Sequence, residues 1–272
     1  MRPRKRLIFC TYSSIYSSIV LQQLVDDDDI EVVAILNSTR VHHPQYGQIR
    51  GAIKQIQLSG WRYSSYLFFV TDLFSWLQPL LSLKGNSLKN NALKTVHTLA
   101  KQHQIPILNS RDINQPDAIQ FITEKEPEVL LAAHFNQLIK CEILELNNLK
   151  SLNIHPSLLP AYKGVDPVFF AMLNNEKRVG VSLHEMAETF DTGKILSQQD
   201  LLISENDTLL SVNKKLFAEG ASLARAWIKE EQGTALEDGN SEGQYDSWPT
   251  PEQVRQLKQS GRLLNRLSGL WR

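Results

Sequence analysis

Residues 153–164 read NIHPSLLPAYKG and join the end of a strand-like run to a loop that holds two prolines and a glycine. Asn153 and His155 stand two positions apart, so on a strand both side chains point to the same face of the sheet. Pro156 and Pro160 restrict the backbone of the loop that follows. The stretch therefore indicates either a built site or a strand end whose polar side chains satisfy backbone groups.

The strand that ends in this stretch belongs to a series of short apolar strands that alternate with helices. This alternation predicts an α/β fold of the Rossmann-like kind, with a mostly parallel sheet and helices on both faces. Ligands of such sheets bind beyond the carboxyl ends of the strands, where Asn153 and His155 stand. The expected strands are 7–10, 31–36, 105–108, 129–133 and 152–155, and the expected helices are 15–25, 91–102, 116–126 and 139–146.

The second half of the chain ends in a short appendage. Asn206 and Asp207 are good capping residues for a long amphipathic helix, and after Gly233 the composition turns polar and glycine-rich. We therefore expect a main domain over residues 1–232 and a C-terminal tail over 233–272. The elements expected in this half are strands at 179–186 and 195–203, the long helix at 208–229 and a tail helix near 251–258.

Residues 57–83 interrupt the alternation with an aromatic and apolar run, inside an insertion of about 50–88. Asp72 and Gln78 break this run, whereas a membrane span needs roughly 20 uninterrupted apolar residues. Two interpretations stay open. The insertion is either a helical pair that packs on the domain or on a second copy, or a lid or surface that meets a greasy substrate or a membrane. An exposed aromatic insertion would also favour a homodimer.

The overall composition excludes some classes of protein. The 272 residues are 42% hydrophobic and 21% charged, which suits one large domain with at most a short appendage. Because the formal net charge is zero, we expect no broad nucleic-acid-binding surface. Cys10 and Cys141 are isolated and offer neither a disulfide framework nor a zinc spacing, which predicts a reducing, cytoplasmic location.

The side chains of the opening stretch suit acyl transfer. An amide can donate a hydrogen bond to a carbonyl oxygen as it gains charge, and an imidazolium can donate a second bond or move a proton. Asp191, in the turn sequence FDTG, could orient His155, favour its charged form or hold a water that relays a proton. Asp-Thr-Gly is also a common turn, so these residues alone leave a purely structural role open.

A resemblance to the folate-dependent formyltransferases is carried by residues 151–198, which read SLNIHPSLLPAYKGVDPVFFAMLNNEKRVGVSLHEMAETFDTGKILSQ. This family includes enzymes that act on glycinamide ribonucleotide, methionyl-tRNA and nucleotide-linked amino sugars, and also the formyl-folate hydrolases. The resemblance continues upstream through PEVLLAAHFNQLI, residues 127–139. It covers about 127–203 well, whereas the first hundred residues or so fit only in outline.

The resemblance implies that 10-formyltetrahydrofolate is the formyl donor and that Asn153, His155 and Asp191 are the catalytic residues. An acceptor amine would attack the formyl carbon while Asn153 and protonated His155 stabilise the oxyanion. Asp191 would support His155 and help to relay the amine proton to the departing folate nitrogen, and no metal is required. Two loops would form the pteridine slot, and the expected contacts are Phe135, Gln137, Leu138, Ile139, Ser157, Ala187, Glu188, Thr189 and Phe190.

Other histidines have less certain roles in this sequence. The pair His42 and His43 is either an acceptor contact or part of a plain surface loop. His134 ends a strand beside the implied folate slot and is either a pocket wall or a packed side chain. His184 lies in the middle of an expected strand, so we expect it to be structural.

The chain departs from each well-defined branch of the family. Where the ribonucleotide enzymes carry a glycine-rich turn it reads CTYSSIYSSIV, residues 10–20, without glycine. About forty residues follow the long helix, too few for the closed barrel of the methionyl-tRNA enzymes. Little precedes Leu7, where the hydrolases usually carry a regulatory domain.

We therefore expect formyl transfer to the primary amine of a small molecule, with a nucleotide-linked amino sugar as the leading candidate. The alternatives are hydrolysis of 10-formyltetrahydrofolate, or an acceptor that is a lipid-linked amine, glycinamide ribonucleotide or methionyl-tRNA. A chain that only binds folate or a partner is a further alternative, which the intact trio argues against.

Overall fold

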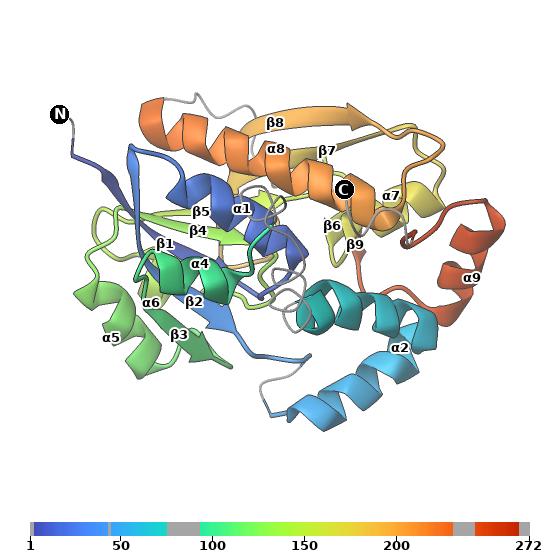
Figure 1. The fold of residues 1–272 in the computed structure, drawn as a ribbon, viewed down its shortest axis with the longest axis horizontal. Coiled ribbons are helices and arrows are strands. Elements are labelled where there is room, and N and C mark those ends of the chain that lie inside the picture. Colours follow the sequence, from blue (N-terminus) through green and yellow to red (C-terminus); the bar gives the residue numbers. More distant parts are fainter. Residues whose placement is uncertain (1–2, 43–44, 75–92, 231–242, 267–272) are drawn as a thin grey trace, which may run out of the picture.

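The computed structural model describes residues 3–42, 45–74, 93–230 and 243–266. Its centre is a seven-stranded sheet, in which six strands run in the same direction and one, next to the last in spatial order, runs antiparallel to both of its neighbours (Figure 1). The expected mostly parallel sheet is thereby confirmed. In spatial order the strands are β3 (Ile107–Ser110), β2 (Ile30–Ser38), β1 (Lys5–Thr11), β4 (Val129–Ala133), β5 (Lys150–His155), β7 (Arg178–Glu185) and β8 (Ile195–Leu202).

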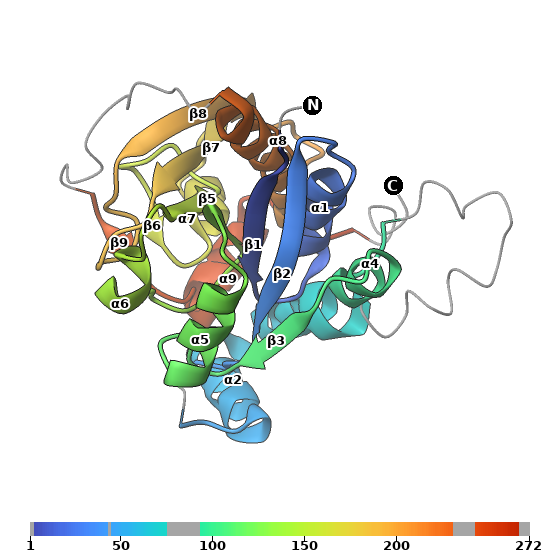
Figure 2. The ribbon, with the colours of Figure 1, turned by 90° about the vertical axis from the view of Figure 1, so that its left-hand side faces the viewer.

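Helices cover both faces of the sheet because its central strands are apolar on both sides. Leu7 and Phe9 of β1 pack into one core, whereas Ile8 and Cys10 of the same strand pack into the other. Figure 2 shows the two layers on opposite sides of β1 and β2. The first core is covered by α1 (Ile15–Val25), α4 (Val96–Gln102) and α8 (Leu209–Glu230), and the second by α5 (Pro116–Glu124) and α6 (Cys141–Leu144).

The long helix α8 begins beside the expected capping residues. The Oγ1 of Thr208 accepts the backbone N–H of Ser211 at 3.2 Å. The carboxylate of Asp207 accepts hydrogen bonds from the Ser211 hydroxyl and from Lys215. Thr208 therefore accepts one of the free backbone N–H groups of the first turn of α8, as polar residues at a helix N-terminus do. Asp207 binds two side chains of the same helix.

The insertion begins earlier than the aromatic run suggested. Helix α2 (Gln48–Phe68) continues into a π-helical turn, η1 (Phe69–Leu73), and α2 bends at Gly60, whose φ of +74° is a left-handed value. Residues 75–83 of the expected helical pair lie outside the described residues. Within the described ranges, no helix is long and apolar enough to cross a bilayer.

The described part of the tail returns to the body of the molecule. Helix α9 (Pro251–Gln259) packs against α2 and against α7 (Pro167–Leu173). The two-residue strand β9 (Tyr245–Asp246) pairs in parallel with β6 (Lys163–Gly164), which lies in the loop after β5. The tail is thus joined to the same loop that the opening stretch of sequence forms.

Candidate active site

The fold brings three polar segments together at the carboxyl end of β5. Asn153 and His155 occupy the last positions of that strand, and β7 runs antiparallel beside it. The strand register places His184 directly opposite Asn153 and Ser182 opposite His155. Asp191 enters from the turn between β7 and β8. The three residues expected to be catalytic therefore lie at one place, with His184 as a fourth member.

Asp191 is held in a left-handed turn conformation with a φ of +57°. Its Oδ1 lies 3.3 Å from Nδ1 of His155, and its Oδ2 accepts the backbone N–H of Gly164 at 2.9 Å. The side chain is only 7% exposed. Gly193 lets this turn close, because a Cβ there would lie 1.8 Å from the carbonyl oxygen of Glu185. The carboxylate is thus fixed against the imidazole by backbone geometry as well as by charge.

Both ring nitrogens of His155 face oxygen atoms. Nδ1 faces the carboxylate of Asp191, and Nε2 lies 3.1 Å from the carbonyl oxygen of Tyr162. A carbonyl and a carboxylate only accept hydrogen bonds, so any N–H that His155 carries is directed at one of these two oxygens. A ligand oxygen would have to replace one of these acceptors to receive a hydrogen bond from His155.

His184 has the opposite pattern of partners. Its Nδ1 lies 2.7 Å from the carbonyl oxygen of Glu185 and must donate there, so the neutral ring presents a lone pair at Nε2. The amide Nδ2 of Asn153 donates to that lone pair at 3.0 Å. Burial, together with the nearby His155, lowers the pKa of His184 to about 4, which keeps the ring neutral. The contact fixes the orientation of the Asn153 amide.

A narrow pocket opens beside these groups, between the loop after β4 and the turn after β7. Asn153, His184 and Asp191 form its polar wall. Among the described residues, Asn153 makes no side-chain hydrogen bond other than the one to His184, so its second N–H is available to a ligand. The remaining lining residues are Ala132, Phe135, Gln137, Leu138, Ile139, Met186, Ala187, Thr189 and Phe190.

Seven of the nine expected folate contacts line this pocket, and two do not. The hydroxyl of Ser157 donates to the carbonyl oxygen of Ala161 at 2.8 Å and fastens its own loop. Glu188 is exposed outside the pocket. Gln137 lines the pocket, but its amide bonds Ile113, Ser38 and Ser110, so its side chain holds the ends of β2 and β3.

Sequence reasoning missed three lining residues, which are Ala132, His184 and Met186. His184 and Met186 were expected on a strand, but nothing local shows that this strand pairs with β5. The available signal was the spacing of two between His184, in β7, and Met186, just after it. In extended backbone this spacing puts both side chains on the same face, which here is the face of the site.

The other histidines are placed outside this pocket. His134 is half-buried against Tyr16 and Phe217, and its Nδ1 lies 3.1 Å from the carbonyl oxygen of Tyr12. Burial lowers the pKa of His134, which supports the packed interpretation. The ring of His42 packs edge-on against Trp248 with centroids 5.2 Å apart, and His43 lies outside the described residues. The described residues contain no cluster of three or more His, Cys, Asp or Glu side chains suited to a metal.

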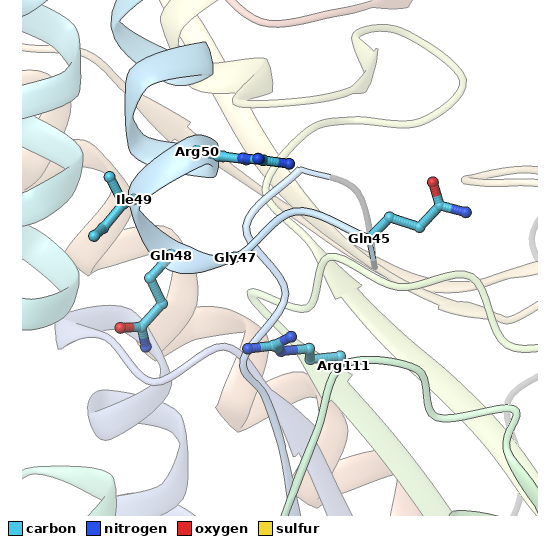
Figure 3. A pocket seen from close by; sticks show the side chains of 6 residues that line it. All are labelled: Gln45, Gly47, Gln48, Ile49, Arg50 and Arg111. Atoms are coloured by element: carbon cyan, nitrogen blue, oxygen red, sulfur yellow. The ribbon is translucent and has the colours of Figure 1, made fainter.

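A second, shallower hollow lies at the start of α2 and contains none of the catalytic candidates (Figure 3). Two arginines reach it, one from the first turn of α2 and one from the residue after β3. Its lining residues are Gln45, Gly47, Gln48, Ile49, Arg50 and Arg111.

Comparison with known proteins is consistent with this geometry. Residues 81–226 match the family model described as formyl transferase. The chain is 35% identical over 143 residues to the bifunctional polymyxin resistance protein ArnA of Wigglesworthia glossinidia brevipalpis, covering 53% of this chain and 22% of that protein. It is 31% identical over 122 residues to the methionyl-tRNA formyltransferase of Thermotoga maritima, covering 45% of this chain and 39% of that enzyme. The matches thus span well under half the length of these relatives.

A solved structure shares the fold. WlaRD, a sugar 3N-formyl transferase crystallised with dTDP and 5-N-formyl-THF, superposes with a TM-score of 0.54 and 22% sequence identity. The match covers 89% of this chain and 69% of that one.

Proposed function

The chain belongs to the formyl transferase family, and from this membership we propose that it moves a formyl group from 10-formyltetrahydrofolate to the primary amine of a small acceptor. The observation that carries the proposal is the convergence of Asn153, His155 and Asp191 at the carboxyl end of β5. Asn153 and Asp191 line the pocket there, and His155 lies behind them against the carboxylate of Asp191. These are the groups that formyl transfer between nitrogen atoms needs, because an oxyanion must be stabilised and a proton must move.

The pocket suits a flat heteroaromatic ring. Phe135, Leu138 and Met186 give it apolar walls, and the loops that carry them offer backbone groups for hydrogen bonds. The free N–H of Asn153 stands at the rim, where a formyl oxygen attached to such a ring would need a donor. When bound, 10-formyltetrahydrofolate would supply the electrophilic carbon and the nitrogen that leaves.

The residues of this chain would then act in order. Asn153 would donate its free N–H to the oxygen as negative charge develops, with its amide held by His184. His155 would supply a second donor through Nε2, with the oxyanion taking the place of the Tyr162 carbonyl oxygen while Nδ1 stays against Asp191. Asp191 would hold His155 and assist the transfer of a proton from the attacking amine to the departing nitrogen.

A nucleotide-linked amino sugar is the acceptor we propose. The structural likeness to a sugar N-formyltransferase supports it. The serine-rich turn before α1 also argues against glycinamide ribonucleotide as the acceptor, because the ribonucleotide enzymes carry a glycine-rich phosphate-binding turn at that position. Ser14 and Ser17 form a capping box there, so the N-terminus of α1 is satisfied by its own side chains.

The proposal is tested by incubating the chain with 10-formyltetrahydrofolate and a panel of amines, with formylated product and free formate measured together. The panel contains nucleotide amino sugars, lipid-linked amines and glycinamide ribonucleotide. We expect formylated amino sugar and little free formate. Rapid formate release in the absence of any acceptor would instead indicate a hydrolase.

Substitutions in the site give the second arm of this test. We expect Asn153→Ala, His155→Ala and Asp191→Ala each to lower kcat by about 10²–10³-fold, because each removes an oxyanion donor or its support. Glu219→Ala is the matched control, since this carboxylate is exposed on α8 and does not line the pocket. Near-normal turnover of the His155 variant would refute the assigned mechanism.

A further inference from the structure

Helix α2 has its apolar side chains on the wrong side for a helix that packs only on its own domain. In its first half the buried residues are Gly51, Gln55 and Ser59, which are small or polar. The exposed residues of the same half include Ile49, Ile53 and Ile56. A surface helix normally buries its apolar stripe and exposes its polar side. This half of α2 does the reverse.

The exposed isoleucines form one continuous stripe. At 3.6 residues per turn, Ile49, Ile53 and Ile56 fall within about 60° of one another around the helix axis. Ile49 is 78% exposed. Beyond the bend at Gly60, Trp61 is 71% exposed. Figures 1 and 2 both place α2 at the edge of the molecule, with its first half farthest from the sheet.

The charge on α2 has a single sign. Arg50, Lys54 and Arg62 are exposed, and none of them makes an ion pair with another described residue. The helix contains no aspartate or glutamate. Three unopposed cations on one element stand out in a chain whose formal net charge is zero. A partner that covers this helix must therefore offer an apolar surface to the isoleucines and negative charge to the arginines and the lysine.

We propose that α2 docks the protein on an anionic lipid surface. Isoleucines and a tryptophan beside arginine and lysine are the composition of helices that lie in the headgroup region of a bilayer. Each cation near such a surface strengthens binding by about fivefold. A helix that lies in the interface does not need to cross the bilayer, in keeping with the absence of a spanning helix among the described residues.

The observations favour this partner over two others. A second copy of the chain, related by a two-fold axis, would bring the same arginines and lysine against each other. A nucleic acid would use the cations, but it would leave the isoleucine stripe without an apolar partner. A bilayer with anionic headgroups satisfies both kinds of side chain.

The experiment measures binding of the full chain to sedimented vesicles, and it does not depend on enzymatic activity. Vesicles of phosphatidylcholine mixed with phosphatidylglycerol are compared with vesicles of phosphatidylcholine alone. We expect binding to the mixed vesicles that weakens as salt is added. The double variants Ile49→Gln with Ile53→Gln, and Arg50→Glu with Lys54→Glu, should each lower the bound fraction at least about tenfold.

Matched variants control for general effects of apolarity and charge. Leu202 is 62% exposed on β8, so Leu202→Gln should leave binding unchanged. Lys101→Glu with Lys150→Glu changes the same amount of charge at exposed positions away from α2 and should also bind normally. Because all of these positions are exposed, thermal melting should show that every variant is folded.

Two results would overturn the proposal. One is an absence of binding to the mixed vesicles, or equal binding by the wild type and the Ile49/Ile53 variant. The other is light scattering that shows a dimer of the wild type and a monomer of that variant, which would make the stripe an interface between copies. Either result leaves the formyl-transfer assay unaffected, so the two proposals fail separately.

Discussion

At the scale of single residues, the organisation of the site depends on two histidines with different partners. His155 faces two acceptors, a carboxylate and a backbone carbonyl, whereas His184 is neutral and accepts from Asn153. The difference comes from the partner of each ring nitrogen and needs no difference in burial, since both side chains are buried. An amide that must present one particular N–H to a formyl oxygen benefits from an acceptor that fixes its orientation.

We therefore predict that His184 positions Asn153 for catalysis. His184→Leu removes the acceptor and should lower kcat by about 10- to 100-fold with little change in KM for the folate donor. His184→Gln keeps an oxygen that can accept the same N–H and should recover much of the lost rate. Steady-state kinetics on both variants, with thermal melts as a check on folding, make the comparison. Equal losses in the two variants would indicate a packing role only.

At the scale of elements, the cap of α7 ties that helix to α2. Asp166 is the N-cap residue, in a left-handed conformation with a φ of +48°. Its carboxylate accepts the hydroxyl of Tyr63 at 2.6 Å. Burial raises the pKa of Asp166 to about 6, from an ordinary value of 3.8. This carboxyl is therefore easier to protonate in the folded protein than in the unfolded chain.

The shift predicts how stability depends on pH. Because the folded pKa lies above the unfolded one, the contribution of Asp166 to stability is full below about pH 4 and is lost as pH rises through 6. Asp166→Asn keeps the acceptor oxygen and tolerates the left-handed backbone. We expect this variant to gain on the order of 1 to 3 kcal/mol over wild type at pH 8 and to lose that gain near pH 4. Urea unfolding at the two pH values measures the difference, and a loss of similar size at both would contradict it.

A comparison of individual helices and strands shows which of their bounds the sequence could predict. Helix α1 and strand β4 have the predicted bounds, because their apolar runs are long or fully buried. Strand β3 lies at Ile107–Ser110, two residues beyond the prediction, because its register is set by pairing with β2. Helix α7 was not predicted, although Asp166 followed by Pro167 is a helix start. The start of helix α2 at Gln48 was not predicted, because the apolar side chains of its first half are exposed and therefore do not mark a buried helix face.

The site was predictable to the extent that it follows from strand geometry and a recognisable motif. Asn153 and His155 share a strand face, and the family resemblance gave Asp191 its role beside them. The role of His184 depends on the antiparallel register between β5 and β7, which local sequence does not state. The contact of Ser157 with the cofactor stays a prediction; its hydroxyl donates to the carbonyl oxygen of Ala161 in its own loop.

At the scale of the whole molecule, the tail reaches the active site through one glycine. Gly164 donates its N–H to Asp191, and its φ is +101°. A Cβ at this position would lie 2.2 Å from the carbonyl oxygen of Asp246 in β9. The next residue, Val165, donates its N–H to that same oxygen at 2.8 Å. The tail strand thus supports the backbone that holds the carboxylate of Asp191.

This coupling predicts that Gly164→Ala lowers kcat well beyond its effect on stability. The added methyl would push β9 away and move the N–H that Asp191 accepts, and a misplacement of about 1 Å can cost about 100-fold in rate. Gly261→Ala is the matched control, because Gly261 has a φ of +81° but an added methyl there would meet nothing within 4 Å. Both variants carry the cost of a left-handed alanine. Gly164→Ala should lose further stability because its methyl also meets the backbone of Asp246. Kinetics and melts on the pair separate strain from displacement, and equal kcat values would disprove the coupling.

The pairing of β9 with β6 also bears on when the protein can first work during its synthesis. A ribosome makes Asn153, His155 and Asp191 long before it reaches Tyr245 and Asp246. The sheet can form from the nascent chain, since all seven of its strands precede residue 203. The loop that holds Asp191, however, gains its last support only when the tail has emerged. Catalytic competence should therefore arrive late, only after Tyr245 and Asp246 have left the ribosome.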